Sequence, residues 1–338
     1  MLRKKPTVFP QLFASSRSRG GRSARPIATS PGISSALRPG VQLDVWSVVL
    51  AAGAGRRLSP LTGGIPKQYW QPHGRMSLLD GTLERLNPLI PARRTITIVD
   101  QSHRGYVNAL ANVERLGDIV YQPQDRGTAA GVLLGVLTVR AHVGDAIVVL
   151  TPSDHGVQRP EAFREGLRTA IHAARTGRAP VVLFGVEPDR AYRDYGWITA
   201  APAAKPGDLA RVGQFVEKPT EVEATRLLAS GAVWNTMVLV ARASALVERY
   251  RQQLPGLYAV LAPIAGLSDI QRRRYLATIY PTLPFFDFSH DLLTGGGDLW
   301  LSTWPSSLGW SDLGTPERMS AWNVENSRLA AHAASSAA

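Results

Sequence analysis

The sequence contains no cysteine and no long hydrophobic run. Without cysteine, neither a disulfide nor a thiolate metal site can form, and the composition is compatible with the reducing cytoplasm, where we expect the protein. No apolar run approaches the ~18–20 residues that cross a bilayer, so we expect no membrane association. Among the 338 residues, 44 % are hydrophobic and 19 % are charged, which is typical of a globular protein with a sizeable core.

Acidic residues are absent from residues 1–40, which hold eight of the 38 Lys and Arg residues. The rest of the chain carries the other 30 against 26 acidic residues, a net charge of +4, so the overall +12 belongs mainly to this segment. Its Ser, Gly, Pro and Arg content without apolar periodicity predicts a disordered basic tail. An organelle transit peptide has a similar composition. We favour the disordered tail over targeting and over a nucleic-acid partner.

Short apolar runs alternate with helix-like segments along the first half of the chain. This alternation predicts an α/β fold with a doubly wound, mostly parallel sheet. The strands are expected at 46–53, 95–100, 118–124, 146–154 and 180–188, and the helices at 77–90, 108–116, 127–143 and 160–177.

After residue 190 the pattern changes. Two short Gly-bounded strands, 195–200 and 211–219, predict a small β excursion. A helix at 221–231, a strand at 232–242 and a helix at 243–254 are expected to follow. We place one domain at 41–325, a flexible C-terminal tail at 326–338, and expect no second catalytic domain.

The stretch VVLAAGAGRRLSPLTGGIPKQ, residues 48–68, joins a predicted strand to glycines, two arginines and a lysine. At the carboxyl edge of a parallel sheet such turns face a common crevice, and glycines let peptide N–H groups approach phosphate oxygens. The spacing matches neither G-x-G-x-x-G nor a Walker A loop. Spacing alone is equally compatible with a phosphate-binding loop and an ordinary turn. Pro66 stiffens the chain before Lys67, which favours the phosphate-binding loop.

Eight segments, in order, make the chain resemble the nucleotidyltransferases that produce sugar nucleotides, particularly mannose-1-phosphate guanylyltransferases. They are LAAGAGRRLSPLT…PKQ, QDRGTAAG (124–131), TPSDH (151–155), YGWI (195–198), FVEKP (215–219), WNTM (234–237), FFDFSHDLL (285–293) and GWSDLGT (309–315). The resemblance covers roughly residues 46–320. It implies a Rossmann-like sheet of the nucleotide-diphospho-sugar transferase type.

The activity implied by the resemblance is nucleotidyl transfer from a nucleoside triphosphate, expected to be GTP, to a sugar 1-phosphate, expected to be mannose 1-phosphate. The products would be GDP-mannose and pyrophosphate. Because the attacking phosphate is already an anion, the protein must align two anions and neutralise charge rather than supply a strong base. Arg57 and Lys67 correspond to the family's signature cations, whereas Arg56 occupies a variable position. Solvated surface charge is the alternative for these cations.

The resemblance also implies a nucleotide site and a metal. Asp154 and Asp312 would share one Mg²⁺, which prefers hard oxygen ligands and commonly takes one or two protein carboxylates. From the residues alone, Asp154 could instead cap a turn and Asp312 a helix. His155 is not assigned as a ligand. The backbone positions implied for the nucleotide are Ala51, Ala52, Gly53, Gly55, Gly127, Thr128 and Ala129.

The implied sugar-phosphate site consists of Gly196, Glu217, Lys218 and Asn235. If FVEK is a strand, Glu217 and Lys218 point to opposite faces unless the strand ends there, which Pro219 favours. Asp287 has either a supporting role or a hydrogen bond that stabilises the fold. Of the tryptophans, Trp197 and Trp234 are the two that could line a pocket.

Two departures from the family pattern leave the substrates open. Met237 stands where the family has a glycine that lets the backbone approach the sugar. The segment DRGTAAG lies between the guanylyl type and relatives that use other nucleotides. Another nucleotide with another hexose 1-phosphate, or a non-catalytic sensor of nucleotide sugars on the same fold, are the alternatives. A homo-oligomer is compatible with the sequence.

Overall fold

The computed structural model describes residues 43–71, 76–201 and 209–336. The predicted basic tail at 1–40 therefore lies outside the described residues. Residues 43–338 form one compact unit. Within the described residues, no helix has the length and hydropathy needed to cross a membrane.

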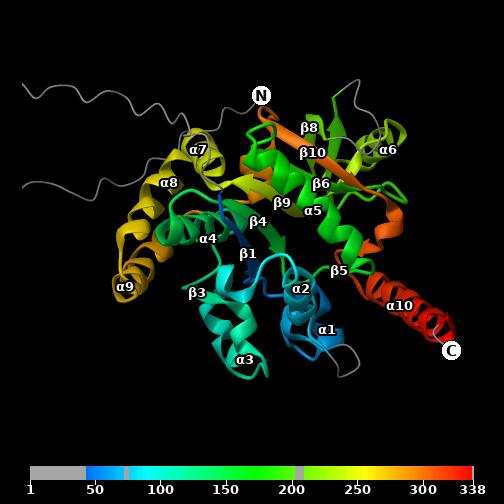
Figure 1. Ribbon diagram of the computed structural model, residues 1–338, viewed down its shortest axis with the longest axis horizontal. Helices are drawn as coiled ribbons and strands as arrows, with labels where there is room; N and C mark the ends of the chain where they lie inside the picture. The colour runs from blue at the N-terminus through cyan, green and yellow to red at the C-terminus, as the bar shows by residue number, and fades with distance from the viewer. Residues whose placement is uncertain (1–42, 72–75, 202–208, 337–338) are drawn as a thin grey trace, which may run out of the picture. The chain divides into compact units, whose positions relative to one another are not determined.

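A nine-stranded sheet in the order β3-β2-β1-β4-β9-β6-β10-β8-β7 forms the centre of the unit (Figure 1). Its first four strands are parallel neighbours. Every residue of β2 and β4 is buried, as expected for parallel strands covered on both faces. These four strands are β1 (Val45–Ala51), β2 (Thr95–Asp100), β3 (Asp118–Gln122) and β4 (Ile147–Pro152), which confirms the predicted strands.

The second part of the sheet is rich in antiparallel pairs. Strand β9 runs antiparallel between β4 and β6, while β10 pairs in parallel with β6. The predicted β excursion is the β7–β8 hairpin, and β7 also pairs with β9, so that Trp197 lies opposite Trp234. The strands are β6 (Val181–Val186), β7 (Gly196–Ala200), β8 (Ala210–Glu217), β9 (Val233–Arg242) and β10 (Leu299–Trp304).

A separate two-stranded sheet joins distant parts of the chain. Strand β5 (Gly156–Val157), directly after β4, pairs antiparallel with β11 (Trp310–Ser311) near the C-terminus. This pairing carries the segment after Asp154 to the segment before Asp312.

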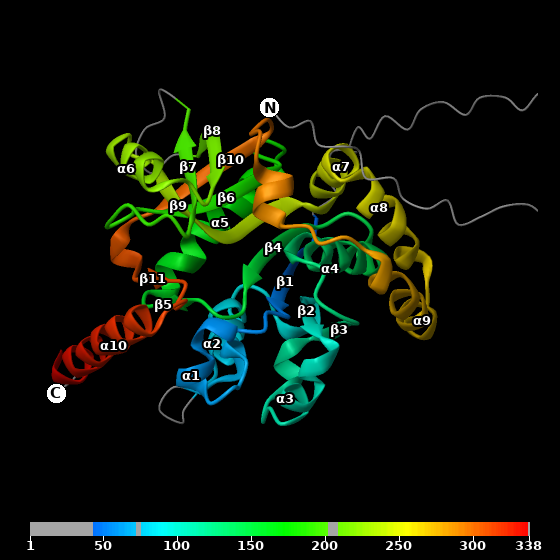
Figure 2. The ribbon, with the colours of Figure 1, turned by 180° about the vertical axis from the view of Figure 1, so that it is seen from behind.

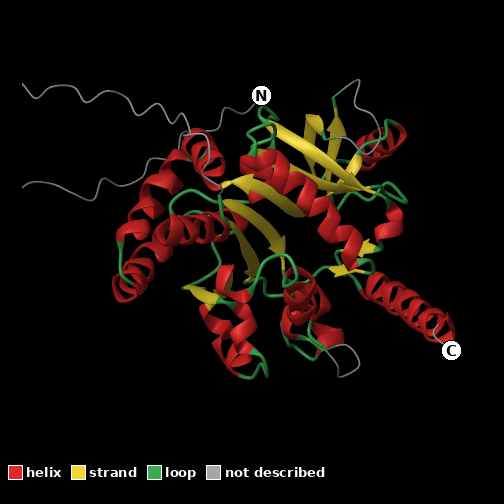
Figure 3. Cartoon of the chain, viewed as in Figure 1, coloured by secondary structure: helices red, strands yellow, loops and turns green. Residues whose placement is uncertain are grey.

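Helices cover both faces of the main sheet, because alternate strand residues point to opposite sides (Figure 3). Val48 belongs to a core with α4, α7 and α8, and its neighbour Val49 to a core with α2 and α5. Figure 2 shows α7, α8 and α9 following one another along the molecule. The main helices are α2 (Leu78–Leu86), α4 (Thr128–Val143), α5 (Pro160–Arg175), α6 (Glu221–Ala229), α7 (Ala243–Gln253), α8 (Pro255–Leu261), α9 (Asp269–Ile279) and α10 (Pro316–Ser336).

Two expectations differ from the structure. The helix predicted at 108–116 is wrong: α3 (Arg104–Asn108) ends where it should begin, and only a 3₁₀ turn follows at Val113–Leu116. The chain must approach the start of β2 here, since a Cβ at Gly117 would lie 2.2 Å from the Thr95 carbonyl oxygen. Residues 326–336, placed in a tail by the sequence, belong to α10.

Candidate functional site

The glycine loop after β1 is held by the segment that carries Lys67. The buried Gln68 amide donates hydrogen bonds to the carbonyl oxygens of Ala51 and Gly53, each at 2.9 Å. Gly55 has a φ of +62°, and a Cβ there would lie 2.7 Å from the backbone nitrogen of Lys67. A glycine is therefore required where the loop meets the lysine. Sequence reasoning missed the role of Gln68, although its position beside Lys67 in PKQ was the available signal.

Lys67 links this loop to both predicted carboxylate segments. Its side chain is only 6 % exposed, and Nζ lies 3.1 Å from Asp154 Oδ2 and donates to the carbonyl oxygen of Asp312. Asp312 is 245 positions away in the sequence. The buried ammonium group thus joins three segments that the chain supplies separately.

Arg57 lies in the 3₁₀ turn Arg56–Leu58, which directly follows Gly55. Arg56 and Arg57 are both exposed, and neither forms an ion pair within the part of the chain that the structure describes. Their geometry does not distinguish the two side chains, so the preference for Arg57 remains a prediction.

Asp154 follows β4 at the carboxyl edge of the parallel strands, and a third of its side chain is exposed. Burial by itself would raise the pKa of this carboxyl group, but the Lys67 ammonium holds it below its ordinary value. His155 Nε2 lies 3.8 Å from Asp154 Oδ1. Burial lowers the pKa of His155 to about 4, so its ring is neutral at neutral pH and packs edge-on against Trp310.

Asp312 is engaged by groups that sequence reasoning did not anticipate. Arg318 Nη1, from the first turns of α10, lies 2.9 Å from both carboxylate oxygens, and the Tyr195 hydroxyl donates to Oδ1 at 2.8 Å. The Arg318 guanidinium also lies over the rings of Tyr192 and Tyr195, at 4.6 and 4.7 Å. Burial would raise the pKa of Asp312, but Arg318 and the Tyr195 hydroxyl are among the groups that hold it low.

The two carboxylates differ in how well they fit a metal ion. Both offer the hard oxygen donors that Mg²⁺ prefers. Asp154 has one oxygen on Lys67 and a partly exposed side chain, so it fits such a site. Asp312 fits only if Arg318 moves away, because that guanidinium now contacts both of its oxygens. No cluster of three or more acidic or His side chains suited to a metal occurs among the described residues.

The predicted nucleotide segment at the start of α4 packs against another part of the chain. Gly127 has a φ of +84°, and a Cβ there would lie 2.1 Å from the Phe286 carbonyl oxygen. The same oxygen accepts the Ala129 N–H at 3.1 Å, and Thr128 Oγ1 accepts the Phe288 N–H at 2.7 Å. Of the three predicted residues only Thr128 is exposed, so packing by itself accounts for the glycine.

The predicted sugar-phosphate residues come together on β7, β8 and β9. Gly196 pairs with Glu217, and a Cβ on Gly196 would lie 2.7 Å from Glu217 Oε2 and 3.3 Å from Asn235 Cβ. Strand β8 ends at Glu217, as Pro219 suggested, and Lys218 turns back so that its Nζ lies 3.4 Å from Glu217 Oε1. Burial raises the pKa of Glu217, and nearby Asp287 adds to this effect.

Met237 adopts the backbone conformation of a glycine. Its φ is +57°, and it shares this left-handed region with only two other non-glycine residues in the described ranges, Lys218 (φ +47°) and Leu313 (φ +49°). All three lie in the motifs of the family resemblance, and such strain commonly gathers at functional sites. The Met237 N–H donates to Asn235 Oδ1 at 3.1 Å, and Ser289 Oγ lies 3.1 Å from its sulfur.

Trp197, Trp234 and Asp287 have different environments in the structure. Trp197 is fully buried and packs in the core, so it lines no pocket. Trp234 lines a cavity of about 360 Å³ together with Tyr192, Tyr195 and Arg318. Asp287 Oδ1 accepts the His290 N–H at 2.9 Å, so a hydrogen bond that stabilises the local turn is present.

Residues 46–327 match the model of the nucleotidyl transferase family. The chain is 31 % identical over 275 residues to the alginate biosynthesis protein AlgA of Pseudomonas syringae, covering 79 % of this chain and 56 % of the relative. It is 30 % identical over 285 residues to the mannose-1-phosphate guanylyltransferase ManC of Salmonella typhimurium, covering 81 % of this chain and 58 % of the relative.

A solved structure from Thermus thermophilus, described as a mannose-1-phosphate geranyltransferase, has a TM-score of 0.71 and 29 % identity. The similarity covers 80 % of this chain and 77 % of that one. The chain spans a little over half the length of the curated relatives named above.

Proposed function

We propose that this chain, which belongs to the nucleotidyl transferase family, moves a nucleotidyl group from a nucleoside triphosphate to a sugar 1-phosphate and releases pyrophosphate. The observation that carries the proposal is the position of Lys67. This buried cation contacts Asp154 and the backbone at Asp312, and its neighbour Gln68 binds the glycine loop. A charge centre of this kind suits a reaction in which two anions must meet.

The proposed substrates are GTP and mannose 1-phosphate. Support comes from relatives such as ManC, whose name includes mannose-1-phosphate guanylyltransferase. The backbone at Met237 reaches the same left-handed region that a glycine would occupy, which keeps the turn beside Asn235 despite the substitution.

Different residues of the chain would bind the triphosphate, the sugar phosphate and the metal. Lys67 would neutralise the triphosphate and the departing pyrophosphate, and exposed Arg57 would add charge at the loop. Glu217, Lys218 and Asn235 would orient the sugar phosphate beside Gly196, where a side chain would clash with Glu217. Bound Mg²⁺ would supply further charge neutralisation; Asp154 would hold it, and Asp312 would join after release from Arg318.

The proposal is tested by pyrophosphate release from a panel of triphosphates and sugar 1-phosphates in the presence of Mg²⁺. We expect release that needs both substrates and is strongest with GTP and mannose 1-phosphate. If no pair releases pyrophosphate above the protein-free control, the proposed transfer is wrong.

A second candidate, a non-catalytic sensor of nucleotide sugars, has one observation in its favour. The contact of Arg318 with both Asp312 oxygens leaves one of the two predicted metal ligands occupied. Micromolar binding of a sugar nucleotide without any turnover would support the sensor, and measurable turnover would exclude it.

A further inference from the structure

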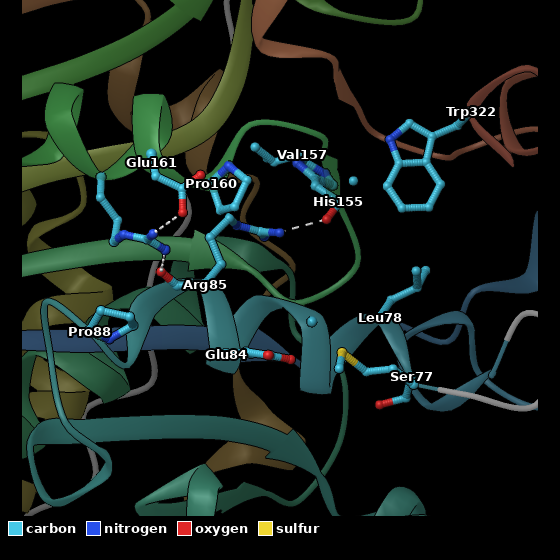
Figure 4. Close-up of a pocket in the computed structure, with 14 residues that line it drawn as sticks. Ser77, Leu78, Glu84, Arg85, Pro88, His155, Val157, Pro160, Glu161 and Trp322 are labelled. Carbon is cyan, nitrogen blue, oxygen red and sulfur yellow. Dashed lines mark hydrogen bonds and ion pairs between the residues drawn. The ribbon is translucent and has the colours of Figure 1, made fainter. Parts of the chain in front are cut away.

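A second cavity, of about 520 Å³, is lined by the residues drawn in Figure 4. Its walls come from α2, from the segment that follows Asp154, and from Trp322 of α10. None of the predicted nucleotide, sugar or metal residues lines it. Its volume lies within the range of about 300–1,000 Å³ that is usual for small-molecule sites.

Arg85 is the unusual residue of this cavity. It is 8 % exposed and forms no ion pair within the described part of the chain. Its Nη2 donates to Thr82 Oγ1 at 3.1 Å and to the His155 carbonyl oxygen at 3.4 Å, while Nε is buried without a partner. Burial lowers the pKa of Arg85 to about 10, because a charge removed from water without a counter-ion is penalised.

The other charges around the cavity do not balance Arg85. Arg164 and Glu161 pair with each other at 2.7 Å. Glu84 is exposed and has no ion pair with a described residue, so it lies in water rather than on Arg85. The guanidinium of Arg85, which lies 5.1 Å from the centre of the Phe163 ring, therefore has no counter-ion among the described residues.

Two further polar atoms of the lining lack partners. His155 Nδ1 and Trp322 Nε1 are both buried without a hydrogen bond to any described residue. The rest of the lining is largely apolar and includes Leu78, Val157 and Pro160. A ligand that suits this surface needs an anionic group for Arg85 and an apolar body for the opposite walls.

We propose that this cavity binds a small organic molecule with a single anionic group, a carboxylate or a phosphate ester, through Arg85. A charge-assisted bond to the anion offsets the cost of burying the guanidinium, and the apolar body packs against Leu78 and Trp322. The exposed carboxylate of Glu84 at the edge of the cavity disfavours ligands that carry a second anionic group. Nothing in this binding step depends on the proposed function.

The cavity is connected to the centre around Lys67 through one residue. Arg85 holds the carbonyl oxygen of His155, which directly follows Asp154. An anion on Arg85 competes for this guanidinium and changes the restraint on the segment after β4. If the proposed transfer is correct, ligand binding here alters turnover, which makes the cavity a regulatory site.

The test measures binding to the full chain by calorimetry, with phenyl phosphate and benzoate as probes and phenol as the neutral control. We expect one equivalent of at least one anion to bind and phenol not to bind. Arg85→Gln should weaken binding by about 10- to 100-fold, the value of one charge-assisted hydrogen bond. Arg168→Gln, which removes an exposed arginine of α5 paired with Glu165, should leave binding unchanged.

A second variant keeps the test decisive if Arg85→Gln does not fold. Gly81 lines the cavity, and a Cβ there would meet only Met76 Sδ, at an ordinary 3.7 Å. Gly81→Leu should therefore fill the cavity within an intact α2 and abolish binding.

Several outcomes would overturn the proposal. The first is that neither phenyl phosphate nor benzoate binds up to about 10 mM. The second is that binding is unchanged in Gly81→Leu. The third is that binding is lost in Lys67→Met but not in Gly81→Leu. The last result would place the anion among the residues of the proposed reaction. Binding that follows Arg85 and Gly81 in a protein without turnover would support this site while rejecting the proposed function.

Discussion

The parallel and antiparallel halves of the sheet carry two different kinds of candidate site. At the end of the parallel strands, Lys67 lies in contact with Asp154, and the pKa of that carboxyl group is lowered. At the antiparallel strands, burial raises the pKa of Glu217, and Lys218 and Met237 adopt left-handed backbone conformations. The first centre is thus built from a paired charge, and the second from a desolvated carboxyl group and strained turns.

This difference follows from how each half holds its loops. Parallel strands bring their carboxyl ends to one edge, so the loops after β1 and β4 meet without unusual backbone angles in Lys67 or Asp154. In the antiparallel half, the chain must turn sharply at the end of β8 and within β9 to place Lys218 and Asn235 beside Gly196. Asp312 connects the halves, since it accepts from Tyr195 next to β7 while its backbone accepts from Lys67.

The largest effect is expected from Lys67→Met, which removes the charge of the parallel centre. Pyrophosphate release should fall by about 100- to 1,000-fold, because electrostatic stabilisation of the developing charge is lost. The measurement is kcat/KM with saturating Mg²⁺. Arg94→Gln, which removes an exposed cation paired with Asp44, is the matched control and should change activity less than about twofold. Activity within threefold of wild type in Lys67→Met would contradict the assignment.

The connection between the halves is tested by Arg318→Ala. Asp312 would keep the Tyr195 hydrogen bond but lose its cation, so the free energy of unfolding should fall by about 1–3 kcal/mol at pH 7. Urea unfolding with and without Mg²⁺ measures this change. If Arg318 prevents Asp312 from binding the metal, Mg²⁺ should stabilise the variant more than it stabilises wild type. Equal stabilisation of both proteins would show that Arg318 and the metal do not compete.

Met237→Gly tests the strained turn of the antiparallel half. Relief of the left-handed conformation stabilises by about 1 kcal/mol, and loss of the Met237–Ser289 contact offsets part of it. The net change in unfolding free energy should therefore stay within about 1 kcal/mol. We expect a lower KM for the sugar 1-phosphate with little change in the KM for the triphosphate. A change confined to the KM for the triphosphate would show that this turn does not contribute to the sugar 1-phosphate site.

The smallest expected effect concerns pH. The raised pKa of Glu217 means that its contribution to stability is present below the ordinary value near 4.5 and is lost as the pH rises through the folded-state pKa. Asp154 has a lowered pKa, so its contribution is present above about 3.8 and is lost as the pH falls. The free energy of unfolding is measured between pH 3 and 7 for wild type and both variants. At neutral pH it should be higher than that of wild type in Glu217→Gln and lower than that of wild type in Asp154→Asn. The same sign in both variants would contradict the comparison.

The parallel half was also the half that the sequence predicted best. The alternation of residue types in TITIVD predicts a strand at 95–100, and β2 occupies these residues with every side chain buried. Strand β10 was missed, since its pairing with β6 is made across more than one hundred residues and leaves little local pattern in LWLSTW. The wrong helix at 108–116 occurs where tertiary contacts at Gly117 force the chain close to β2.

The sequence predicts which residues belong to the candidate site, but it does not predict most of the contacts between them. The meeting of Lys67 with Asp154 depends on the parallel order of β1 and β4, which the strand pattern predicts in outline. The contact between Arg318 and Asp312 depends on the β5–β11 pairing and on where α10 begins, and no local spacing encodes either. Tyr195 and Arg318 are identified as parts of the site only through their contacts with Asp312.

The central claim, that the Lys67 centre transfers a nucleotidyl group, is tested most directly by following the α-phosphate. The protein is mixed with GTP labelled at that phosphate, mannose 1-phosphate and Mg²⁺, and the label is located by chromatography in wild type and Lys67→Met. Wild type is expected to move the label into a nucleotide sugar, and the variant, although folded, is expected to leave it on GTP. Equal transfer by both proteins, or no transfer by wild type with any triphosphate and sugar 1-phosphate, would contradict this claim.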